Sequence, residues 1–308
     1  MARFNAYDLR TEKYRYLRGN SDYVEKAEAL FENSLIVPSG MAAISLVIQA
    51  YSVKTIWYPD DIYQGTYELI HGLGLVFDDK NPDMVIYDYP SFRGIYWKKR
   101  FPNAIIVADI SVEPFRKPDC DLIVTSLSKY HTNCETVLGL IVFKSERCMK
   151  DRDRIAELRW KSGYVVFEEQ IKALFRHYCK FGNENEFEIY VREFGLKAKA
   201  IGKKLDELGI DNVIAGGLVF VLLSDELDSR EVALASPFNL CPTYGAEVTF
   251  LTYSYCEDNL RYFGNDKRKG NYLRVSPGLV NSFKIAEDIA LSIYKAIKDV
   301  ERRNFYNG

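Results

Sequence analysis

The sequence contains few histidines and no closely spaced cysteines, which argues against a metal centre. Its three histidines, His71, His131 and His177, do not have the spacing of metal ligands, and its six cysteines include no CxxC pair. In a chain of this size, scattered cysteines are typical of reduced thiols rather than of a disulfide framework or a zinc site. We therefore expect a cytoplasmic protein without a bound metal.

The sequence also lacks long apolar runs and an excess of charge of one sign. No segment approaches the ~18 consecutive apolar residues of a membrane-spanning helix, and the first residues lack the apolar core of a signal peptide. The chain carries 41 lysines and arginines against 43 aspartates and glutamates, so nothing indicates a nucleic-acid surface. These absences predict a partner that is neither a membrane nor a nucleic acid.

What the sequence has is the composition of a globular protein with a substantial core. Hydrophobic residues make up 47% and charged residues 27% of the chain, and 308 residues suggest about two domains. Residues 1–24 have few aliphatic side chains and predict an N-terminal arm. We expect a large domain over 25–182 and a small C-terminal domain over 183–308, divided at the polar stretch that follows Gly182.

Short strands alternate with helical patterns in the first half of the chain, which favours a largely parallel α/β sheet. The patterns predict strands at 35–37, 55–58, 84–87, 104–108, 121–125, 139–143, 218–223 and 272–276. They predict helices at 24–32, 40–51, 66–72, 152–181, 186–208 and 282–302.

The segment TSLSKY at 125–130 is the most informative for function. An apolar run ends there in two hydroxyl side chains, Ser126 and Ser128, followed by Lys129. Hydroxyls can anchor a phosphate and a lysine amine can form a Schiff base with an aldehyde, and an enzyme that uses pyridoxal 5'-phosphate (PLP) needs both. By itself the pattern also fits an ordinary polar loop.

A second segment, VPSGMAA at 37–43, reads as a strand, a tight turn and the start of a helix. Backbone N–H groups at a helix N-terminus favour an anion such as phosphate. The glycine of the turn, Gly40, allows another chain segment or a ligand to approach the backbone closely. A strand–turn–helix with no ligand would look the same.

Three further side chains lie where a cofactor or substrate could use them. Asp109 ends an apolar strand 20 residues before Lys129, where its carboxylate could pair with a pyridine nitrogen or merely cap a loop. Tyr63, beside the Gly65 turn, could stack on a flat cofactor or pack within a loop. Arg274 lies in an apolar strand, where a guanidinium needs an anion, either an internal carboxylate or that of a substrate.

Six segments in sequence order together resemble the cystathionine γ-synthase / cystathionine γ-lyase family of Cys/Met-metabolism PLP enzymes. SGMAA at 39–43 is identical to a family motif, and the other segments are similar to family motifs: YLRGN at 16–20 to YSRxGNP, YQGTY at 63–67 to YGGTY, DIS at 109–111 to DNT, SLSKY at 126–130 to SxTKY and LRVSPGL at 273–279 to LRLSxGL. The resemblance implies the PLP-dependent transferase fold type I, an α/β fold with a mostly parallel sheet in a large PLP-binding domain and a smaller C-terminal α+β domain.

The resemblance also implies roles for individual residues. Lys129 would bind PLP covalently and move protons, Tyr63 would stack on the ring and assist catalysis, and Asp109 would pair with the ring nitrogen. The other cofactor contacts would come from Ser39, Gly40, Met41, Ser126 and Ser128. Arg274 and Thr243 would bind an amino-acid substrate. Tyr16 and Arg18 would reach the cofactor phosphate of a neighbouring subunit, which implies a homo-oligomer, a dimer of dimers with shared active sites.

Several segments depart from the family pattern around the substrate more than around the cofactor. Phe92 stands where the family has an asparagine, Ile110 replaces another asparagine, and Pro242 stands where members that handle cystathionine usually carry an acid. The stretch after the lysine, from His131 to Glu135, is also altered. These departures leave PLP binding expected and leave the particular substrate open.

The function that follows is elimination from an amino acid with a sulfur-type substituent at the γ or β carbon, a lyase reaction. Three alternatives remain open at this point. One is replacement of the γ substituent, as in a transsulfuration synthase. Another is an unrelated fold type I activity, such as a β-eliminating lyase or an aminotransferase, which the SGMAA segment and the segment around Arg274 argue against. The third is a family member that binds PLP without turnover, and retention of both Lys129 and Arg274 argues against it.

Overall fold

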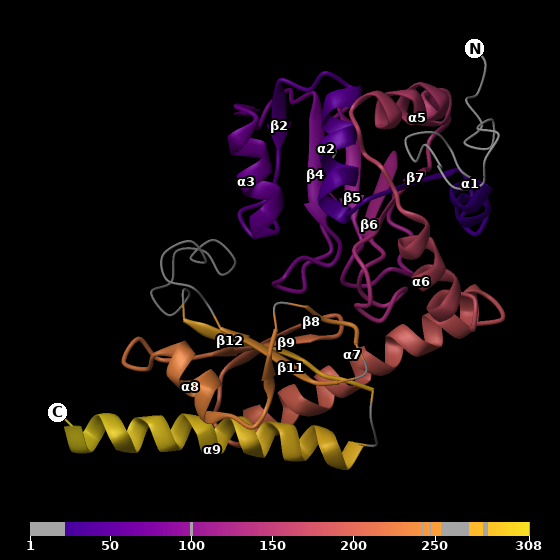
Figure 1. Ribbon diagram of the computed structural model, residues 1–308. Coiled ribbons are helices and arrows are strands. Elements are labelled where there is room, and N and C mark those ends of the chain that lie inside the picture. Colours follow the sequence, from indigo (N-terminus) through magenta and orange to yellow (C-terminus); the bar gives the residue numbers. More distant parts are fainter. Residues whose placement is uncertain are drawn as a thin grey trace.

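The computed structural model describes residues 22–98, 101–241, 243–246, 248–253, 271–279 and 283–307. Within these residues the chain forms two sheets, one from its first half and one from its second half. Figure 1 shows the first sheet with its helices in the upper part of the view and the second sheet in the lower part, above the long C-terminal helix.

The first sheet has seven strands in the order β1-β7-β6-β5-β4-β2-β3. They are β1 (Ser34–Val37), β2 (Thr55–Trp57), β3 (Val76–Phe77), β4 (Met84–Asp88), β5 (Ile105–Asp109), β6 (Leu122–Ser126) and β7 (Gly139–Phe143). The pairings from β3 across to β6 are parallel, whereas β7 runs antiparallel to both of its neighbours. Strands such as β4, which is buried along its whole length, are typical of parallel sheets covered on both faces. The predicted largely parallel sheet is confirmed.

Six helices from the described part of the chain before residue 180 cover this sheet. They are α1 (Asp22–Glu28), α2 (Gly40–Ala50), α3 (Gln64–Gly72), α4 (Glu146–Met149), α5 (Arg152–Lys161) and α6 (Glu168–Tyr178). Leu46 of α2 belongs to one core with Val107 and Val124 of the sheet. On the opposite face, Val24 of α1 and Ile171 of α6 share a core with Leu140, because side chains alternate between the two faces of a strand.

The second sheet has five strands in the order β10-β11-β12-β9-β8 and is mostly antiparallel. Its strands are β8 (Asn212–Ala215), β9 (Leu218–Leu222), β10 (Asn239–Leu240), β11 (Phe250–Tyr253) and β12 (Tyr272–Ser276), and its helices are α7 (Glu184–Glu207), α8 (Ser229–Ala235) and α9 (Phe283–Asn307). Ile201 of α7 and Ile293 of α9 pack in one core with Val221 and Leu273 of the sheet. Among the described residues, no helix combines the length and the apolar character needed to cross a membrane.

The structure corrects one predicted helix and adds short elements. Residues 152–181 do not form a single helix but the two helices α5 and α6, separated by a turn in which Gly163 has a φ of 75°. Because the left-handed region favours glycine, the helix ends there.

The prediction missed several short elements of 2 to 7 residues, namely β3, α4, β8, α8, β10 and β11. Residues 22–24, expected in the arm, begin α1, and the division into domains stays a prediction.

Candidate functional site

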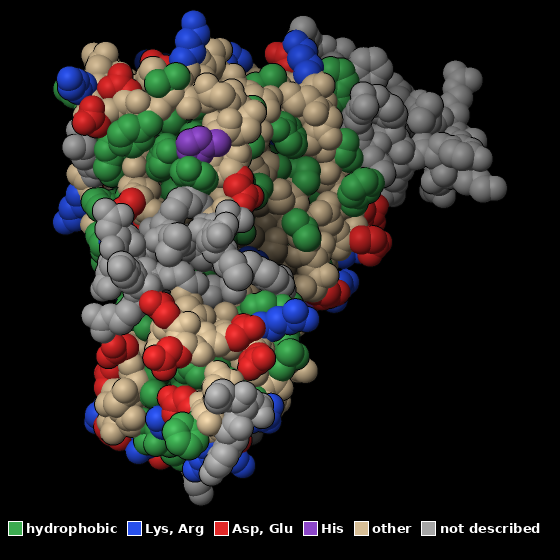
Figure 2. All heavy atoms as spheres, turned by 90° about the vertical axis from the view of Figure 1, so that its left-hand side faces the viewer, with side chains coloured by type: hydrophobic (Ala, Val, Ile, Leu, Met, Phe, Trp, Pro, Cys, Tyr) green, Lys and Arg blue, Asp and Glu red, His purple; other side chains and the backbone are tan. Residues whose placement is uncertain are grey.

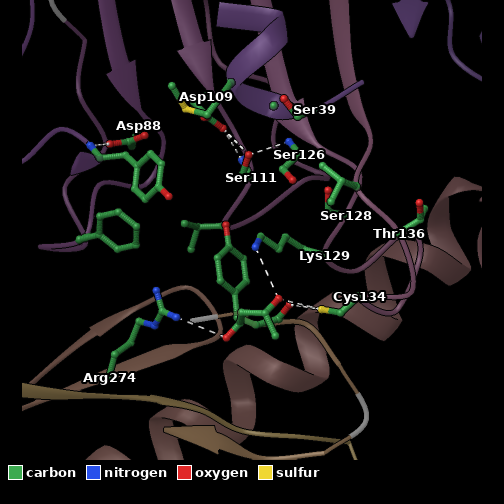
Figure 3. A pocket seen from close by; sticks show the side chains of 18 of the residues that line it. Ser39, Asp88, Asp109, Ser111, Ser126, Ser128, Lys129, Cys134, Thr136 and Arg274 are labelled. Atoms are coloured by element: carbon green, nitrogen blue, oxygen red, sulfur yellow. Dashed lines mark hydrogen bonds between the residues drawn. The ribbon is translucent and has the colours of Figure 1, made fainter. Parts of the chain in front are cut away.

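A cavity of about 380 Å³ lies between the carboxyl ends of the parallel strands and the second sheet, and Figure 2 shows the surface hollowed between the two halves of the molecule. Ten of the predicted site residues line this cavity: Ser39, Gly40, Met41, Tyr63, Asp109, Ser126, Ser128, Lys129, Thr243 and Arg274. Figure 3 shows side chains from both halves turned toward its centre. The remaining two, Tyr16 and Arg18, lie outside the described residues.

The N-terminus of α2 forms one wall of the cavity. Ser39 is the N-cap of the helix, and its hydroxyl accepts a hydrogen bond from Ala42 N at 3.0 Å, as N-cap serines do. Gly40 follows, and a Cβ atom there would lie 3.1 Å from the Cβ of Ser126. This close approach brings the helix N-terminus next to the end of β6, where free backbone N–H groups favour an anion.

The two serines before the lysine, Ser126 and Ser128, make different hydrogen bonds. Ser126 lines the cavity, and its backbone N–H donates to Ser111 Oγ at 2.7 Å. Ser128 also lines the cavity, but its hydroxyl donates to Leu138 O at 3.1 Å and accepts from Leu138 N at 2.9 Å. Ser128 therefore ties the loop after β6 to the residue before β7, and a phosphate would have to compete with Leu138 for its proton.

Asp109 lies at the carboxyl end of β5 with one oxygen held in place. Its Oδ1 accepts hydrogen bonds from the backbone N–H of Ser111 at 2.8 Å and from the Ser111 hydroxyl at 2.5 Å. Burial raises the pKa of Asp109, while the bonds from Ser111 and the nearby Lys129 oppose that rise. A raised pKa in a cavity marks a carboxyl group that would gain from a cationic partner.

A second acid, Asp88, lies beside Asp109 at the end of the neighbouring strand β4, and the two are register partners. Asp88 is only 5% exposed, and its Oδ2 accepts a hydrogen bond from the backbone N–H of Tyr63 at 2.6 Å. Burial and the Asp109 carboxyl raise the pKa of Asp88 well above its ordinary value. The bond fixes the start of α3, and with it the place from which the Tyr63 side chain enters the cavity.

Lys129 lies across the cavity, with its amine directed at residues of the second half of the chain. Its Nζ is 3.5 Å from Thr243 Oγ1 and 4.9 Å from the centre of the Tyr244 ring (Figure 3). Burial lowers the pKa of Lys129, and Arg274 acts in the same direction, while the Cys134 thiol and Asp109 oppose them. A lowered pKa increases the fraction of neutral amine, which is the nucleophilic form.

Arg274 projects from β12 toward the cavity and meets no carboxylate among the described residues. Its Nη2 donates to Thr252 Oγ1 at 3.2 Å and to Thr243 O at 3.4 Å, while its buried Nε has no hydrogen-bond partner. A guanidinium normally pairs with an anion through two parallel hydrogen bonds. The sequence left open whether Arg274 pairs with an internal carboxylate or with that of a substrate. The part of the chain that the structure describes offers no internal carboxylate as its partner.

Several cavity residues were not among the predicted site residues. Phe92 packs 6.0 Å from the Tyr63 ring and 5.5 Å from the Phe220 ring, measured between ring centres. Cys134 lies 3.0 Å from Thr243 Oγ1 and donates to Tyr244 O at 3.1 Å. Burial raises the pKa of the Cys134 thiol, which keeps it protonated. Both positions fall in segments where the sequence departs from the family pattern, and that departure is the signal that could have identified them as cavity residues.

The histidines do not belong to this site. His131 is buried among Phe31, Tyr178 and Phe187. His177 is partly buried, and its Nε2 lies 2.5 Å from the Glu135 carboxylate. The described residues contain no group of three or more His, Cys, Asp and Glu side chains that could hold a metal ion.

The residues of the cavity fit the parts of PLP one by one. The N-terminus of α2 with Gly40 and the Ser126 side chain form an anion cradle. A buried acid, Asp109, could face a pyridine nitrogen, and the amine of Lys129 has the lowered pKa that a covalent bond to an aldehyde needs. The unpartnered Nε of Arg274 leaves a place for a carboxylate.

Comparison with solved structures finds the same fold in several enzymes. A cystathionine γ-synthase from Xanthomonas oryzae pv. oryzae, solved in complex with cystathionine, matches with a TM-score of 0.72 at 18% identity, over 93% of this chain and 89% of that one. A cystathionine γ-lyase from Lactobacillus plantarum, complexed with L-serine, matches with a TM-score of 0.73 at 15% identity, over 98% and 93%.

A third structure, from Campylobacter jejuni subsp. jejuni, contains N'-pyridoxyl-lysine-5'-monophosphate and matches with a TM-score of 0.69 at 16% identity, over 90% of this chain and 85% of that one. By sequence, no family model matches the chain, and no curated protein matches it significantly. The predicted fold, that of the fold type I PLP-dependent enzymes, is confirmed by these structures.

Proposed function

We propose that this protein is a PLP-dependent enzyme that eliminates the γ or β substituent of a sulfur-type amino acid. The observation that carries the proposal is a single cavity in which an amine of lowered pKa, a buried acid and an arginine without a carboxylate partner meet. The likeness in fold to the cystathionine γ-lyase from L. plantarum supports the same class of reaction.

In this proposal the first half of the chain holds the cofactor. The backbone N–H groups of Gly40 and Met41, with the Ser126 hydroxyl, would bind its phosphate, and Asp109 would bind its ring nitrogen. Tyr63, at the entrance of α3, would lie against its ring. When bound, PLP supplies an electron sink that stabilises negative charge on the substrate's α carbon.

Lys129 is the proton carrier of the reaction. Its neutral Nζ would accept the proton from the substrate's α carbon, and the lowered pKa increases the fraction of the amine that is in this neutral form. For a β substituent, the sulfur then leaves with its bonding electrons and takes up a proton to become a thiol. For a γ substituent, a second proton must first leave the β carbon, and the same amine is the nearest base for that step.

The second half of the chain would hold the substrate. The free hydrogen-bonding groups of Arg274 would bind the α-carboxylate, and Thr243 lies between Arg274 and Lys129, within hydrogen-bonding distance of both. Tyr244 closes this side of the cavity, and its hydroxyl stays protonated because burial raises its pKa well above the ordinary value. Together these residues would orient the α proton toward Lys129 and keep water from the reacting carbons.

The cofactor part of the proposal is tested by borohydride reduction of the PLP-loaded protein followed by peptide mass mapping. We expect the pyridoxyl group on Lys129 in the wild type and none in Lys129→Ala, while Lys144→Ala, which changes an exposed lysine, should label as the wild type does. Label on a different lysine of the wild type would show that the cavity has been assigned wrongly.

The reaction is tested with a panel of β- and γ-substituted amino acids whose products are identified by mass. Release of a keto acid, ammonia and a thiol is the expected result. A product in which an added thiol has replaced the substituent would instead identify a synthase. Bound PLP without any product over the whole panel would leave only a binding protein.

We also propose that the active enzyme is a cytoplasmic homo-oligomer, a dimer of dimers whose sites are shared between subunits. The support is the sequence YLRGN, which places Tyr16 and Arg18 in the family's phosphate-binding arm. Both residues lie outside the described part of the chain, and removal of residues 1–20 tests the role of this arm.

A further inference from the structure

A second and larger cavity lies on the face of the first sheet that α2 does not cover. Its volume is about 650 Å³, and its floor includes Ile123 and Thr125 of β6 and Leu140 of β7. This volume lies within the roughly 300–1,000 Å³ of small-molecule sites, whereas a single water molecule takes up about 30 Å³. The cavity is separate from the one around Lys129, because consecutive residues of a strand face opposite sides of the sheet.

Two polar side chains in the lining of this cavity are buried without a hydrogen-bond partner. The Oγ1 of Thr125 and the Nδ1 of His131 have none in the described part of the chain, and each residue is only 3% exposed. A buried polar atom without a partner costs roughly 1–3 kcal/mol, so folded proteins rarely keep one without a reason. Both residues line one cavity, so a ligand bound there could supply the missing hydrogen bonds.

Several aromatic side chains and charged residues of both signs also line the cavity. The His131 ring lies 4.4 Å from the Phe187 ring and 5.2 Å from the Tyr178 ring, and Phe115 and Phe181 also line the cavity. At the rim, Lys117 pairs with Glu184 at 3.1 Å, and Arg116 pairs with Glu113. Burial lowers the pKa of His131 to about 3, so its ring is neutral near pH 7 and can donate or accept at Nδ1.

We propose that this cavity is a second binding site, for a small, uncharged, flat aromatic molecule that carries one hydrogen-bonding group. The aromatic side chains would stack on its body, and Thr125 and His131 would bind its polar group. Arg116 and Lys117 are already paired with carboxylates. The remaining charged residues of the lining, Glu32 and Lys144, carry opposite charges, so the lining has no strong excess of one sign that would favour an ionic ligand. The proposal does not depend on the reaction proposed for Lys129.

Indole and naphthalene form a suitable pair of probes, because both are flat and apolar and only indole carries an N–H donor. Binding to the purified full chain loaded with PLP would be measured by ligand-observed NMR titration. We expect both probes to bind saturably, with indole bound more tightly. The affinity of each probe should be the same with and without a saturating amino-acid substrate. Displacement by the substrate would place the probes in the Lys129 cavity and overturn the proposal.

The decisive variant is Thr125→Val, which removes the hydroxyl at nearly constant shape. Indole affinity should fall about tenfold, the effect of losing one hydrogen bond of ~1.4 kcal/mol, and naphthalene affinity should not change. The matched control is Thr66→Val, because Thr66 in α3 is equally buried and also has an unpartnered hydroxyl, but does not line this cavity. This control should bind both probes as the wild type does.

Three outcomes would contradict the proposal. The first is the absence of saturable indole binding to the wild type, as would happen if a second copy of the chain covered the cavity. The second is indole binding that Thr125→Val leaves unchanged, which would place the probe elsewhere. The third is an equal loss of indole binding in Thr66→Val, which would show a general loss of packing rather than a specific hydrogen bond.

Discussion

At the scale of single residues, Arg274 and Asp109 both line the cavity but form no ion pair with each other. Arg274 has a cationic side chain with no carboxylate partner among the described residues, and Asp109 has a raised pKa in spite of the two bonds from Ser111. Structural ion pairs usually satisfy one another, as Arg159 of α5 and Glu28 of α1 do. The mismatch in the cavity is the electrostatic signature of a site that binds charged molecules.

Replacing Arg274 by lysine should weaken substrate binding without loss of PLP. Lysine cannot make two parallel hydrogen bonds to a carboxylate, and losing such a pair costs on the order of 2–4 kcal/mol, or roughly 30- to 1,000-fold in affinity. Steady-state kinetics should show a KM raised by that factor, with an unchanged absorbance spectrum. Arg192→Lys, on the exposed face of α7, is the control. If Arg274→Lys unfolded the protein and left substrate affinity intact, the arginine would be structural.

Asp109→Asn should keep the fold and lose most of the turnover. A neutral amide cannot hold a protonated ring nitrogen, so the electron sink is weakened, while the amide oxygen can still accept the bonds from Ser111. We expect kcat to fall by at least about 100-fold, with a melting temperature within a few degrees of the wild type. Near-normal turnover in this variant would show that Asp109 does not act on the ring.

Asp88→Asn should stabilise the PLP-free protein at pH 7. In the folded chain the pKa of Asp88 lies well above its ordinary value of 3.8, so between these two values the unfolded chain has already lost a proton that the folded chain still binds. Stability therefore falls as pH rises through this window. An asparagine avoids this loss and can still accept the Tyr63 N–H, so urea unfolding should show a gain at pH 7 that disappears near pH 3.8.

The control for Asp88→Asn is Asp78→Asn, because the pKa of Asp78 is lowered in the folded chain whereas that of Asp88 is raised. Asp78 is exposed, and hydrogen bonds from the backbone N–H groups of Asn81 and Lys80 lower its pKa. Its charge therefore stabilises the folded chain above pH 3.8 and the variant should not gain stability at pH 7. Equal effects of the two variants would mean that burial beside Asp109 does not govern Asp88.

At the scale of secondary-structure elements, the site depends on how closely β7 approaches the start of α2. Gly139 opens β7, and a Cβ atom there would lie 2.7 Å from Gly40 N, nearer than carbon and nitrogen atoms can pack. Gly139→Ala should therefore push β7 away from the α2 N-terminus. We expect the free energy of unfolding to fall by roughly 1–3 kcal/mol and PLP to dissociate faster.

The matched change is Gly72→Ala at the end of α3, where a Cβ atom would meet nothing within 4 Å. Because alanine is the better helix former, this variant should be as stable as the wild type or up to about 1 kcal/mol more stable. Calorimetry and the rate of PLP loss on dilution would separate the two variants. If Gly139→Ala held PLP as firmly as Gly72→Ala, the close approach would not matter to the phosphate site.

At the scale of the whole molecule, the cavity needs both halves of the chain. The proposed cofactor-binding groups come from the first sheet and its helices, and the proposed substrate-binding groups come from β12 and from Thr243 and Tyr244. The proposed arm would add a third contribution, from another subunit. Removing residues 1–20 should accelerate PLP loss and reduce the mass of the assembly measured by sedimentation. A truncated chain with full activity as a monomer would exclude shared sites.

The sequence by itself determined the elements that the site depends on. The buried strands ending at Asp109 and Ser126 were predicted to within one residue, because an apolar run that ends in polar residues is a local pattern. The serine–glycine turn at the start of α2 was also predicted, since capping and turn preferences act over a few residues. The twelve predicted site residues came from the resemblance to the family rather than from local patterns alone, and ten of them line one cavity.

Tertiary structure decided what depends on distant segments. No local signal shows that β7 runs antiparallel to its neighbours, that Asp88 lies beside Asp109, or that Cys134 meets Thr243. The division of residues 152–181 into two helices and the burial of His131 among aromatic rings likewise follow from packing that outweighs local preference. The protonation of Asp88, Asp109 and Lys129 depends on burial and neighbours, and burial exists only once the two halves of the chain have met.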